Sequence, residues 1–303
     1  MTYIYRLAGD DLELAEADLN GFLESQKINE EASRNGRLAE TESHPRQLKR
    51  LALVHEVSEK ISEASTVEEL EVEEVEGSFA VRKEAVADRE IEDIEGLIGD
   101  EIKSEENEVD LENPDTVFKA YVLDDRVVLG RQVLDIDRGL FRKRSNEKRP
   151  FSSPVSMDPV LARVLVNLSG VKPGEHVLDP FCGTGGILIE AGLCGVGVHG
   201  RDMNNEMVEG AEENLEAYGI INHDIQEKEI SRVETDGYDA LITDLPYGKS
   251  SEMTEDAVNN FVDLIEEFDG RVVFMYNEAS VGGLEADFEV YVHKNLTRYI
   301  FIH

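Results

Sequence analysis

Two short stretches of this sequence place residues that can do chemistry directly after predicted β-strands. The first reads Asp179-Pro180-Phe181-Cys182-Gly183-Thr184-Gly185-Gly186, between a predicted strand and a predicted helix. Its glycines let the backbone approach a ligand closely, and the helix start presents free N–H groups. The pattern is not G-x-G-x-x-G and no P-loop lysine follows, so phosphate is disfavoured and Asp179 suits a cationic ligand such as an ammonium or sulfonium. The candidate binding residues of this turn are Asp179, Phe181, Gly183, Thr184, Gly185 and Gly186.

Two further acids follow the next two predicted strands. Asp202, with its neighbour Met203, stands where a carboxylate can accept both hydroxyls of a ribose. Asp224 stands at the expected end of the third strand, where it can reach an adenine amine. Because open α/β sheets bind ligands beyond the carboxyl ends of their strands, we expect these acids to line one crevice with Asp179. An adenosine that carries a positive sulfonium matches this lining better than NAD or ATP.

The second stretch, Asp244-Leu245-Pro246-Tyr247-Gly248, follows the fourth predicted strand. Pro246 ends the strand, so we expect the Asp244 carboxylate and the Leu245 carbonyl to point out of the sheet. Two acceptors held there can bind both hydrogens of an aryl amine and turn its lone pair toward an electrophile. Tyr247 offers a flat face on which an extruded base can stack. The candidate catalytic residues are Asp244, Leu245, Pro246 and Tyr247.

The cysteines and histidines offer an alternative chemistry. Cys182 can be the nucleophile of a pyrimidine C5-methyltransferase, but it lies in the glycine-rich turn rather than facing a base, which favours a packing role. Cys194 falls on the apolar side of a predicted helix. The seven histidines lack metal-ligand spacing and two cysteines are too few for a structural zinc site, so we expect no metal.

The elements that must position these residues alternate between strand and helix. After a helix over Asp158–Leu168, the pattern predicts, in turn, Glu175–Asp179, Gly186–Leu193, Gly197–Asp202, Asn204–Tyr218, Ile220–Asp224, Asp239–Asp244, Glu255–Phe268 and Arg271–Tyr276. A terminal pair of strands, Phe288–Val292 and Arg298–Ile302, completes the set. Such alternation indicates an α/β fold with a mainly parallel, doubly wound sheet and an antiparallel terminal hairpin.

The N-terminal part has a different pattern, typical of an α+β domain. Thr2–Leu7 alternates as a strand, and Asp10 or Asp11 can cap the amphipathic helix that follows. Further strands are predicted at Leu51–Val57, Ser78–Val81, Val117–Leu123 and Arg126–Val133. Asp124-Asp125 is predicted to join the last two strands in a hairpin.

Basic residues gather where the two patterns meet. This basic island consists of Arg138, Arg142, Lys143, Arg144, Lys148 and Arg149. Pro150, Pro154 and Pro159 follow it and interrupt regular structure. We therefore predict domains at 1–145 and 146–303, and the island is the candidate contact for nucleic-acid phosphates.

The net charge of −36, from 66 acidic and 30 basic residues in a chain of 303, limits the possible partners. Residues 56–115 alone hold 23 acids against 5 bases. One interpretation is that the protein lacks a generally basic surface for nucleic acid. The other is that the acidic surface is an adaptation to a salty cytoplasm, where molar salt shortens the screening length to ~3 Å and carboxylates barely repel one another. No apolar run approaches the ~18 residues of a membrane span and the start lacks signal-peptide features, so we expect a soluble, cytoplasmic protein.

Together these residues resemble a known family. The stretches 179–186 and 244–247 are similar to those of amino-methyltransferases that use S-adenosylmethionine. The segment 149–163, with Arg-Pro-Phe and Ser-Met-Asp-Pro, and the segment 186–192 resemble more specifically the archaeal tRNA guanine-N2-methyltransferases that act on guanosine 10. Segments 78–83 and 109–115 look like parts of the RNA-binding THUMP domain, which this family carries behind a small ferredoxin-like unit.

The resemblance implies a Rossmann-like class I methyltransferase domain behind a THUMP-type RNA-binding domain. Asp179, Asp202 and Asp224 would hold the methionine, ribose and adenine parts of S-adenosylmethionine. Asp244 and the Leu245 carbonyl would orient the N2 amine of a tRNA guanosine, which receives one or two methyl groups. The alternatives are an rRNA guanine-N2 methyltransferase, a DNA adenine-N6 methyltransferase, or a non-catalytic RNA-binding module.

The resemblance also sets expectations about partners and about one departure. The expected partner is tRNA, without membrane or metal, and the chain is expected to be a monomer of a halophilic archaeon, with an accessory subunit left open. The family's usual motif is Asp-Pro-Pro-Tyr, and here Leu245 replaces the first proline. The change keeps the carbonyl but removes a ring that restrains the loop.

Overall fold

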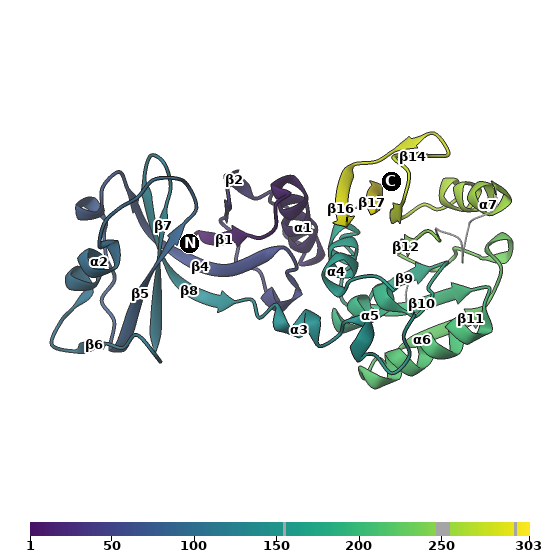
Figure 1. Ribbon diagram of the computed structural model, residues 1–303, viewed down its shortest axis with the longest axis horizontal. Helices are drawn as coiled ribbons and strands as arrows, with labels where there is room; N and C mark the ends of the chain where they lie inside the picture. The colour runs from purple at the N-terminus through teal and green to yellow at the C-terminus, as the bar shows by residue number, and fades with distance from the viewer. Residues whose placement is uncertain (154–155, 247–254, 294–295) are drawn as a thin grey trace. The chain divides into compact units, whose positions relative to one another are not determined.

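The computed structural model describes residues 1–153, 156–246, 255–293 and 296–303, which form two compact units (Figure 1). The N-terminal unit comprises Met1–Glu16, Glu30–Lys49 and Leu53–Asp137. The α/β unit comprises Ala17–Asn29, Arg50–Ala52 and Arg138–His303. The two units are therefore not two continuous stretches of chain, because short N-terminal segments belong to the α/β unit.

The N-terminal unit is built on an eight-stranded sheet in the order β2-β3-β1-β4-β8-β7-β5-β6. Its strands are β1 (Tyr3–Leu7), β2 (Ser33–Asn35), β3 (Leu38–Thr41), β4 (Val54–Ala64), β5 (Gly77–Ala85), β6 (Asn107–Val109), β7 (Thr116–Val122) and β8 (Val127–Asp135). The predicted hairpin is confirmed, since β7 and β8 pair antiparallel up to Val122 and Val127. Helix α2 (Ile94–Ile102) buries Ile94, Ile98 and Ile102 in a core with residues of β5 and β7.

The short elements of this unit escaped the sequence analysis. They are β2, β3, β6 and α2, with the single-turn helices η1 (Leu48–Arg50) and η2 (Val67–Glu69). The two segments that resemble THUMP sequences, 78–83 and 109–115, lie against each other. Ser78 donates from its amide to Asp115 at 2.9 Å, and the Asp110 amide donates to the Phe79 carbonyl at 3.0 Å.

The α/β unit contains the predicted mainly parallel sheet, in the order β11-β10-β9-β12-β13-β17-β16. The strands are β9 (His176–Asp179), β10 (Gly197–Asp202), β11 (His223–Glu227), β12 (Ala240–Asp244), β13 (Arg271–Tyr276), β16 (Phe288–His293) and β17 (Leu296–Ile302). The first five run parallel, and β16 and β17 form the predicted antiparallel hairpin at one edge. A separate small hairpin joins β14 (Ser280–Val281) to β15 (Leu284–Glu285).

Helices cover both faces of this sheet, as Figure 1 shows for α6 and α7. The helices of this unit are α3 (Gly139–Arg142), η3 (Asn146–Lys148), α4 (Pro159–Leu168), α5 (Gly186–Leu193), α6 (Asn205–Ala217), η4 (Ile230–Arg232) and α7 (Glu255–Glu266), together with the part of α1 (Leu12–Ser25) from Ala17 onward. Asp158 and Asn204 accept hydrogen bonds from the first turns of α4 and α6, which fixes where these helices begin. Among the described residues, no helix is both long and apolar enough to cross a membrane.

Two predicted strands are misplaced. The strand predicted at Leu51–Val57 begins three residues before β4 (Val54–Ala64) and ends seven residues before β4 does, and the third strand of the α/β unit is displaced by three residues. The sequence analysis placed the third strand at Ile220–Asp224, whereas β11 runs from His223 to Glu227. The preceding segment still belongs to the end of α6, because the Ile220 amide donates to the Leu215 carbonyl at 3.0 Å after Gly219 turns with a φ of +73°. The helix cap therefore uses the apolar residue that had been assigned to the strand.

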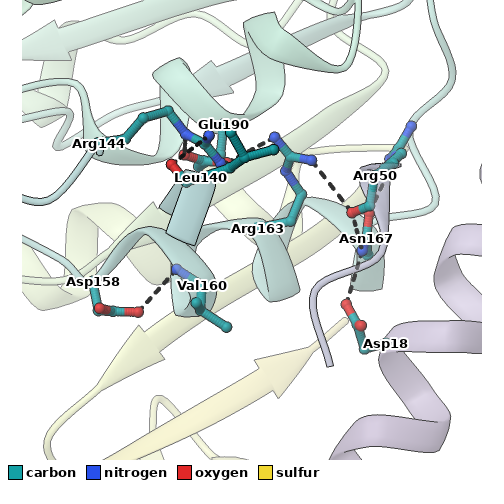
Figure 2. A network of polar contacts seen from close by, with 9 residues as sticks. All are labelled: Asp18, Arg50, Leu140, Arg144, Asp158, Val160, Arg163, Asn167 and Glu190. Carbon is teal, nitrogen blue, oxygen red and sulfur yellow. Dashed lines mark hydrogen bonds and ion pairs between the residues drawn. The ribbon is translucent and has the colours of Figure 1, made fainter. Parts of the chain in front are cut away.

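A buried polar network holds the N-terminal segments in the α/β unit (Figure 2). Asn167 of α4 donates to Asp18 at 2.8 Å and accepts from Arg50 Nε at 2.8 Å. The backbone carbonyl oxygen of Asn167 lies 2.2 Å from the position that a Cβ on Gly21 would take. Helix α1 therefore approaches α4 at a distance that only glycine allows.

The same helix, α4, takes part in a buried ion-pair cluster. Glu190 of α5 is fully buried and lies between two arginines (Figure 2). Arg144 donates to its two carboxylate oxygens at 2.6 and 3.0 Å, and Arg163 lies 2.7 Å from Oε2. Charges this deep are tolerated only in pairs, so the cluster ties α5, which follows the glycine-rich turn, to α4 and to the basic island.

We expect Glu190→Ala to destabilise the fold by roughly 3–5 kcal/mol, because it leaves Arg163 and Arg144 without their buried counter-charge. Urea denaturation measures this change. Glu213→Ala, which removes an exposed carboxylate from α6, is the matched control and should stay within about 0.5 kcal/mol of the parent. Equal unfolding midpoints for the two variants would contradict the structural role of Glu190.

Candidate functional site

The glycine-rich turn lies between β9 and α5, as predicted. Gly183 and Gly185 have φ angles of +50° and +77°, which favour glycine. A Cβ on Gly183 would find nothing within 4 Å, so the backbone there faces open space. The turn is anchored to β10 because the Cys182 amide donates to the Arg201 carbonyl and the Gly183 amide to Asp202 Oδ2, at 2.9 and 3.0 Å.

The other predicted residues of the turn have structural partners. The Thr184 hydroxyl lies 2.9 Å from the hydroxyl of Ser156, and the Thr184 carbonyl accepts from Asn214 at 2.9 Å. Phe181 packs against Phe261 of α7, with 5.9 Å between ring centroids. Gly186 begins α5. The turn is therefore preorganised by contacts from α6, α7 and the segment before α4.

Asp179 ends β9 and is 2% exposed. Its Oδ1 accepts from the Thr243 hydroxyl at 2.6 Å and from the Phe181 amide at 3.1 Å. Burial raises the pKa of this carboxyl to about 7, although both hydrogen bonds act to lower it. A buried carboxyl that is this costly to ionise gains most from a cationic ligand. Thr243 was missed by the sequence analysis, since nothing marks it apart from its place beside Asp244.

Asp202 lies at the end of β10, as predicted, and is joined to the turn. Its Oδ1 accepts from the Asn204 amide at 2.9 Å, while Oδ2 accepts from Gly183. Desolvation raises the pKa of the Asp202 carboxyl. The neighbouring Met203 is 74% exposed, an unusual position for a large apolar side chain, and it offers an apolar surface next to the carboxylate.

The prediction for Asp224 is wrong in its placement. Asp224 is the second residue of β11 and lies opposite His199, three residues before the end of β10. Its carboxylate accepts from Arg201 Nη2 at 2.9 Å and from Gln226 at 2.8 Å. Glu227, which lies opposite Asp202, is the acid at the end of β11. Because the cap of α6 delays the start of β11 by three residues, the strand ends at Glu227 and not at Asp224.

Asp244 is the last residue of β12, as predicted, and β12 lies beside β9 in the sheet. The carboxylate accepts a hydrogen bond from Nη2 of Arg298, which is 2% exposed and comes from β17. This partner lies 54 positions away along the chain, so no local sequence pattern indicates it. Tyr247, the predicted stacking residue, lies outside the described residues.

The chain after Asp244 is held by Leu245, and Pro246 follows half-buried. The Leu245 amide donates to the Met275 carbonyl of β13 at 2.9 Å, a bond that proline cannot make. The Leu245 side chain is fully buried in the core formed by α7, β12 and β13. The expected loss of restraint is therefore offset by an added backbone hydrogen bond and by apolar packing.

The basic island divides into two groups. Arg144 and Arg149, predicted as phosphate contacts, face inward: Arg144 binds Glu190, and Arg149 is 5% exposed and donates to the Arg144 carbonyl at 3.0 Å. Arg144 is engaged with Glu190 and Arg149 is buried, so the predicted phosphate contacts of these two arginines have no support in the structure. Arg142, Lys143 and Lys148 are exposed, and Arg138 is half-exposed.

Cys182 is 5% exposed and packs on Gly200, where an added Cβ would lie 2.8 Å from its sulfur. Burial raises the pKa of its thiol well above the ordinary value, which opposes a nucleophilic role. The packing role is confirmed. Among the described residues, no group of three or more His, Cys, Asp and Glu side chains is arranged to hold a metal ion.

Comparison with known proteins places this geometry in a family. The model of the RMKL-like methyltransferase domain, UPF0020, matches residues 146–279. The tRNA (guanine(10)-N2)-dimethyltransferase of Methanothermobacter thermautotrophicus is 40% identical over 282 residues, which cover 87% of this chain and 84% of that protein. The enzyme of the same name from Pyrococcus abyssi is 32% identical over 280 residues, 84% of each chain.

Solved structures support the fold. The crystal structure of TrmN from Thermus thermophilus has a TM-score of 0.57 at 19% identity, and the likeness covers 100% of this chain and 99% of that one. SMU.472, a putative methyltransferase solved with S-adenosylhomocysteine, has a TM-score of 0.53 at 16% identity and a coverage of 99% and 97%. The predicted Rossmann-like methyltransferase fold is confirmed, and the chain belongs to the family of the archaeal tRNA (guanine(10)-N2)-dimethyltransferases.

Proposed function

We propose that this chain transfers methyl groups from S-adenosylmethionine to the exocyclic N2 of guanosine 10 in tRNA. The observation that carries the proposal is the 2.6 Å hydrogen bond from Thr243 to Asp179, which joins the cofactor turn to the strand that ends in Asp244. The names of the archaeal relatives support this substrate and the transfer of two methyl groups.

The residues of the turn fit S-adenosylmethionine. Asp179 is a buried carboxyl that a positively charged methionine group favours, and Gly183 leaves open space beside it. Asp202 offers acceptor oxygens for ribose hydroxyls, and the exposed Met203 offers an apolar face for adenine. We propose Glu227, which ends β11 opposite Asp202, as the acid that approaches the adenine amine in place of Asp224. When bound, the cofactor supplies an electrophilic methyl group on a sulfonium.

The acceptor side of the site is built from Asp244 and Leu245. A guanine N2 amine is a poor nucleophile, because its lone pair is delocalised into the ring. The Asp244 carboxylate and the Leu245 carbonyl would accept its hydrogens and hold the nitrogen in line with the methyl group, so the gain comes from positioning and electrostatics. Guanine presents adjacent N1–H and N2–H donors that one carboxylate accepts together, which favours guanine over adenine and cytosine.

Incubation with S-adenosylmethionine and unmodified tRNA, rRNA or DNA tests the function. We expect methylated N2-guanosine in tRNA alone, and a tRNA that carries adenosine at position 10 should remain unmethylated. Asp244→Asn should lower the rate at least about 100-fold while cofactor affinity changes less than about twofold. Asparagine is preferred to alanine, because it keeps an oxygen for the buried Arg298.

Asp239→Asn is the matched control, since Asp239 precedes β12 and its carboxylate caps the His176 amide at the opposite edge of the sheet. It should retain the parental rate. Methylation of rRNA or DNA in place of tRNA would overturn the substrate, and full activity of Asp244→Asn would overturn the assignment of the acceptor carboxylate.

The raised pKa of Asp179 predicts a pH dependence. The folded-state pKa of about 7 lies above the ordinary 3.8, so the stability that this group contributes is complete at low pH and falls as pH rises from 3.8 through 7. The ionised form binds the cationic cofactor, so affinity for S-adenosylmethionine should rise between about pH 5 and about pH 8. Isothermal titration calorimetry should show this rise in the parent and in Asp239→Asn, but not in Asp179→Asn. A rise that persists in Asp179→Asn would contradict the role of this carboxyl.

We assign tRNA phosphate contacts to the outward part of the basic island and the reading of RNA to the N-terminal unit. Arg138 and Arg142 line a hollow of about 440 Å³ beside Asp158, and Lys143 and Lys148 are exposed nearby in sequence. Two half-exposed or exposed arginines at a hollow suit a phosphate group. The remaining acidic surface is proposed to be an adaptation to high salt.

Charge reversal at Arg142, Lys143 and Lys148 should raise the KM for tRNA at least about tenfold with little change in kcat, because phosphate contacts contribute to binding rather than to chemistry. Lys172→Glu, in the loop before β9, is the control.

Methylation by the parent should hold or rise from about 0.1 M to about 1 M salt. An unchanged KM, or loss of activity at molar salt, would contradict these assignments.

A further inference from the structure

The candidate acceptor carboxylate has a buried cationic partner that the sequence did not reveal. Nη2 of Arg298 donates to Oδ1 of Asp244. The arginine side chain is 2% exposed, whereas that of Asp244 is 19% exposed. The pair is thus asymmetric, with the guanidinium inside the fold and the carboxylate at the surface of the sheet edge, where a substrate can reach it.

The topology makes this contact a long-range one. β13 lies between β12 and β17, so Asp244 and Arg298 belong to strands that are about 10 Å apart at ordinary strand spacing. Tyr276, the last residue of β13, lies opposite Tyr299, which places Arg298 beyond the end of β13. A long side chain can therefore cross the end of β13 to reach the carboxylate.

Burial makes the arginine dependent on its partner. Desolvation lowers the pKa of Arg298 to about 10, so the group stays charged at neutral pH. A charge removed from water in this way is stabilised by an adjacent carboxylate, and it favours the ionised form of that carboxylate in return. The pair therefore limits both the protonation and the rotation of Asp244.

We infer that Arg298 is the positioning residue of the transfer reaction, which holds Oδ1 of Asp244 so that Oδ2 receives one hydrogen of the substrate amine while the Leu245 carbonyl receives the other. This inference rests on the proposed function, since it gives Asp244 the role of acceptor. Arg298 acts through Asp244 and does not itself touch the substrate.

Other titratable groups lie at the same edge of the sheet, and their effects on the pH profile must be distinguished from that of Asp244. Asp179 belongs to the neighbouring strand β9, Tyr276 to β13 and Tyr299 to β17. In the proposed function Asp179 contacts the cofactor, so saturating S-adenosylmethionine holds its ionisation constant in the assay. Burial raises the pKa of Tyr276, so it stays neutral across the acid range. A change in the acid limb of the kcat profile at saturating cofactor therefore reports on Asp244.

The test compares Arg298→Gln, which keeps an amide donor but removes the charge, with Arg298→Lys, which keeps the charge. For Arg298→Gln we expect kcat to fall at least about tenfold, with the KM values for tRNA and S-adenosylmethionine within about twofold of the parent. The acid limb of its kcat profile should move to higher pH, because the carboxylate has lost its cation. Arg298→Lys should keep the acid limb of the parent.

Thermal unfolding and cofactor binding of each variant separate positioning from folding. If Arg298→Gln does not fold, the acid limb of Arg298→Lys decides the matter, and a limb at higher pH than that of the parent overturns the inference. An unshifted limb in a folded Arg298→Gln overturns it equally. Parent protein without activity on tRNA would instead overturn the proposed function, so the two failures are distinguishable.

Discussion

The active-site edge depends on one buried hydrogen bond, in which the Thr243 hydroxyl donates to the Asp179 carboxyl. Thr243 is fully buried and stands next to Asp244, so the bond fixes the distance between the carboxyl proposed to hold the cofactor and the carboxylate proposed to hold the base. The backbone pairing of the two parallel strands ends at Leu178 and Leu241, and this side-chain hydrogen bond continues the contact beyond that point. Methyl transfer depends on alignment over a short distance, and this bond supplies a rigid reference for both partners.

Much of this architecture follows from local sequence. The bounds of α5, β10 and β13 agree with the prediction at both ends, because a glycine lies at or directly before the start of each element and a continuous apolar run follows in α5 and β13. The residues of the turn and Asp244 could be placed for the same reason, since each follows a strand that its own pattern defines. The start of β11 was misplaced because the apolar residue Ile220, which looks like the beginning of a strand, belongs to the cap of α6.

Contacts between residues that are far apart in the sequence could not be predicted from local patterns. Arg298 lies 54 positions from Asp244, and Asp18 lies 149 positions from Asn167. No periodicity encodes such contacts, since they depend on strand order and on which charges become buried together. The same holds for the basic island: its spacing gives no indication that Arg144 pairs with Glu190 inside the unit while Lys143 stays exposed.

The leucine at position 245 shows how a local departure is absorbed by its surroundings. A proline there restrains the backbone by its ring, but it also ends the pairing of β12 with β13, because it has no N–H. Leucine restores the donor, so the pairing continues one residue beyond Asp244 to the Met275 carbonyl. Its side chain adds fully buried apolar area next to Phe261 and Phe274. Residue 245 is thus restrained by β13 and α7 instead of by a proline ring, and the orientation of the Leu245 carbonyl depends on the packing of those elements.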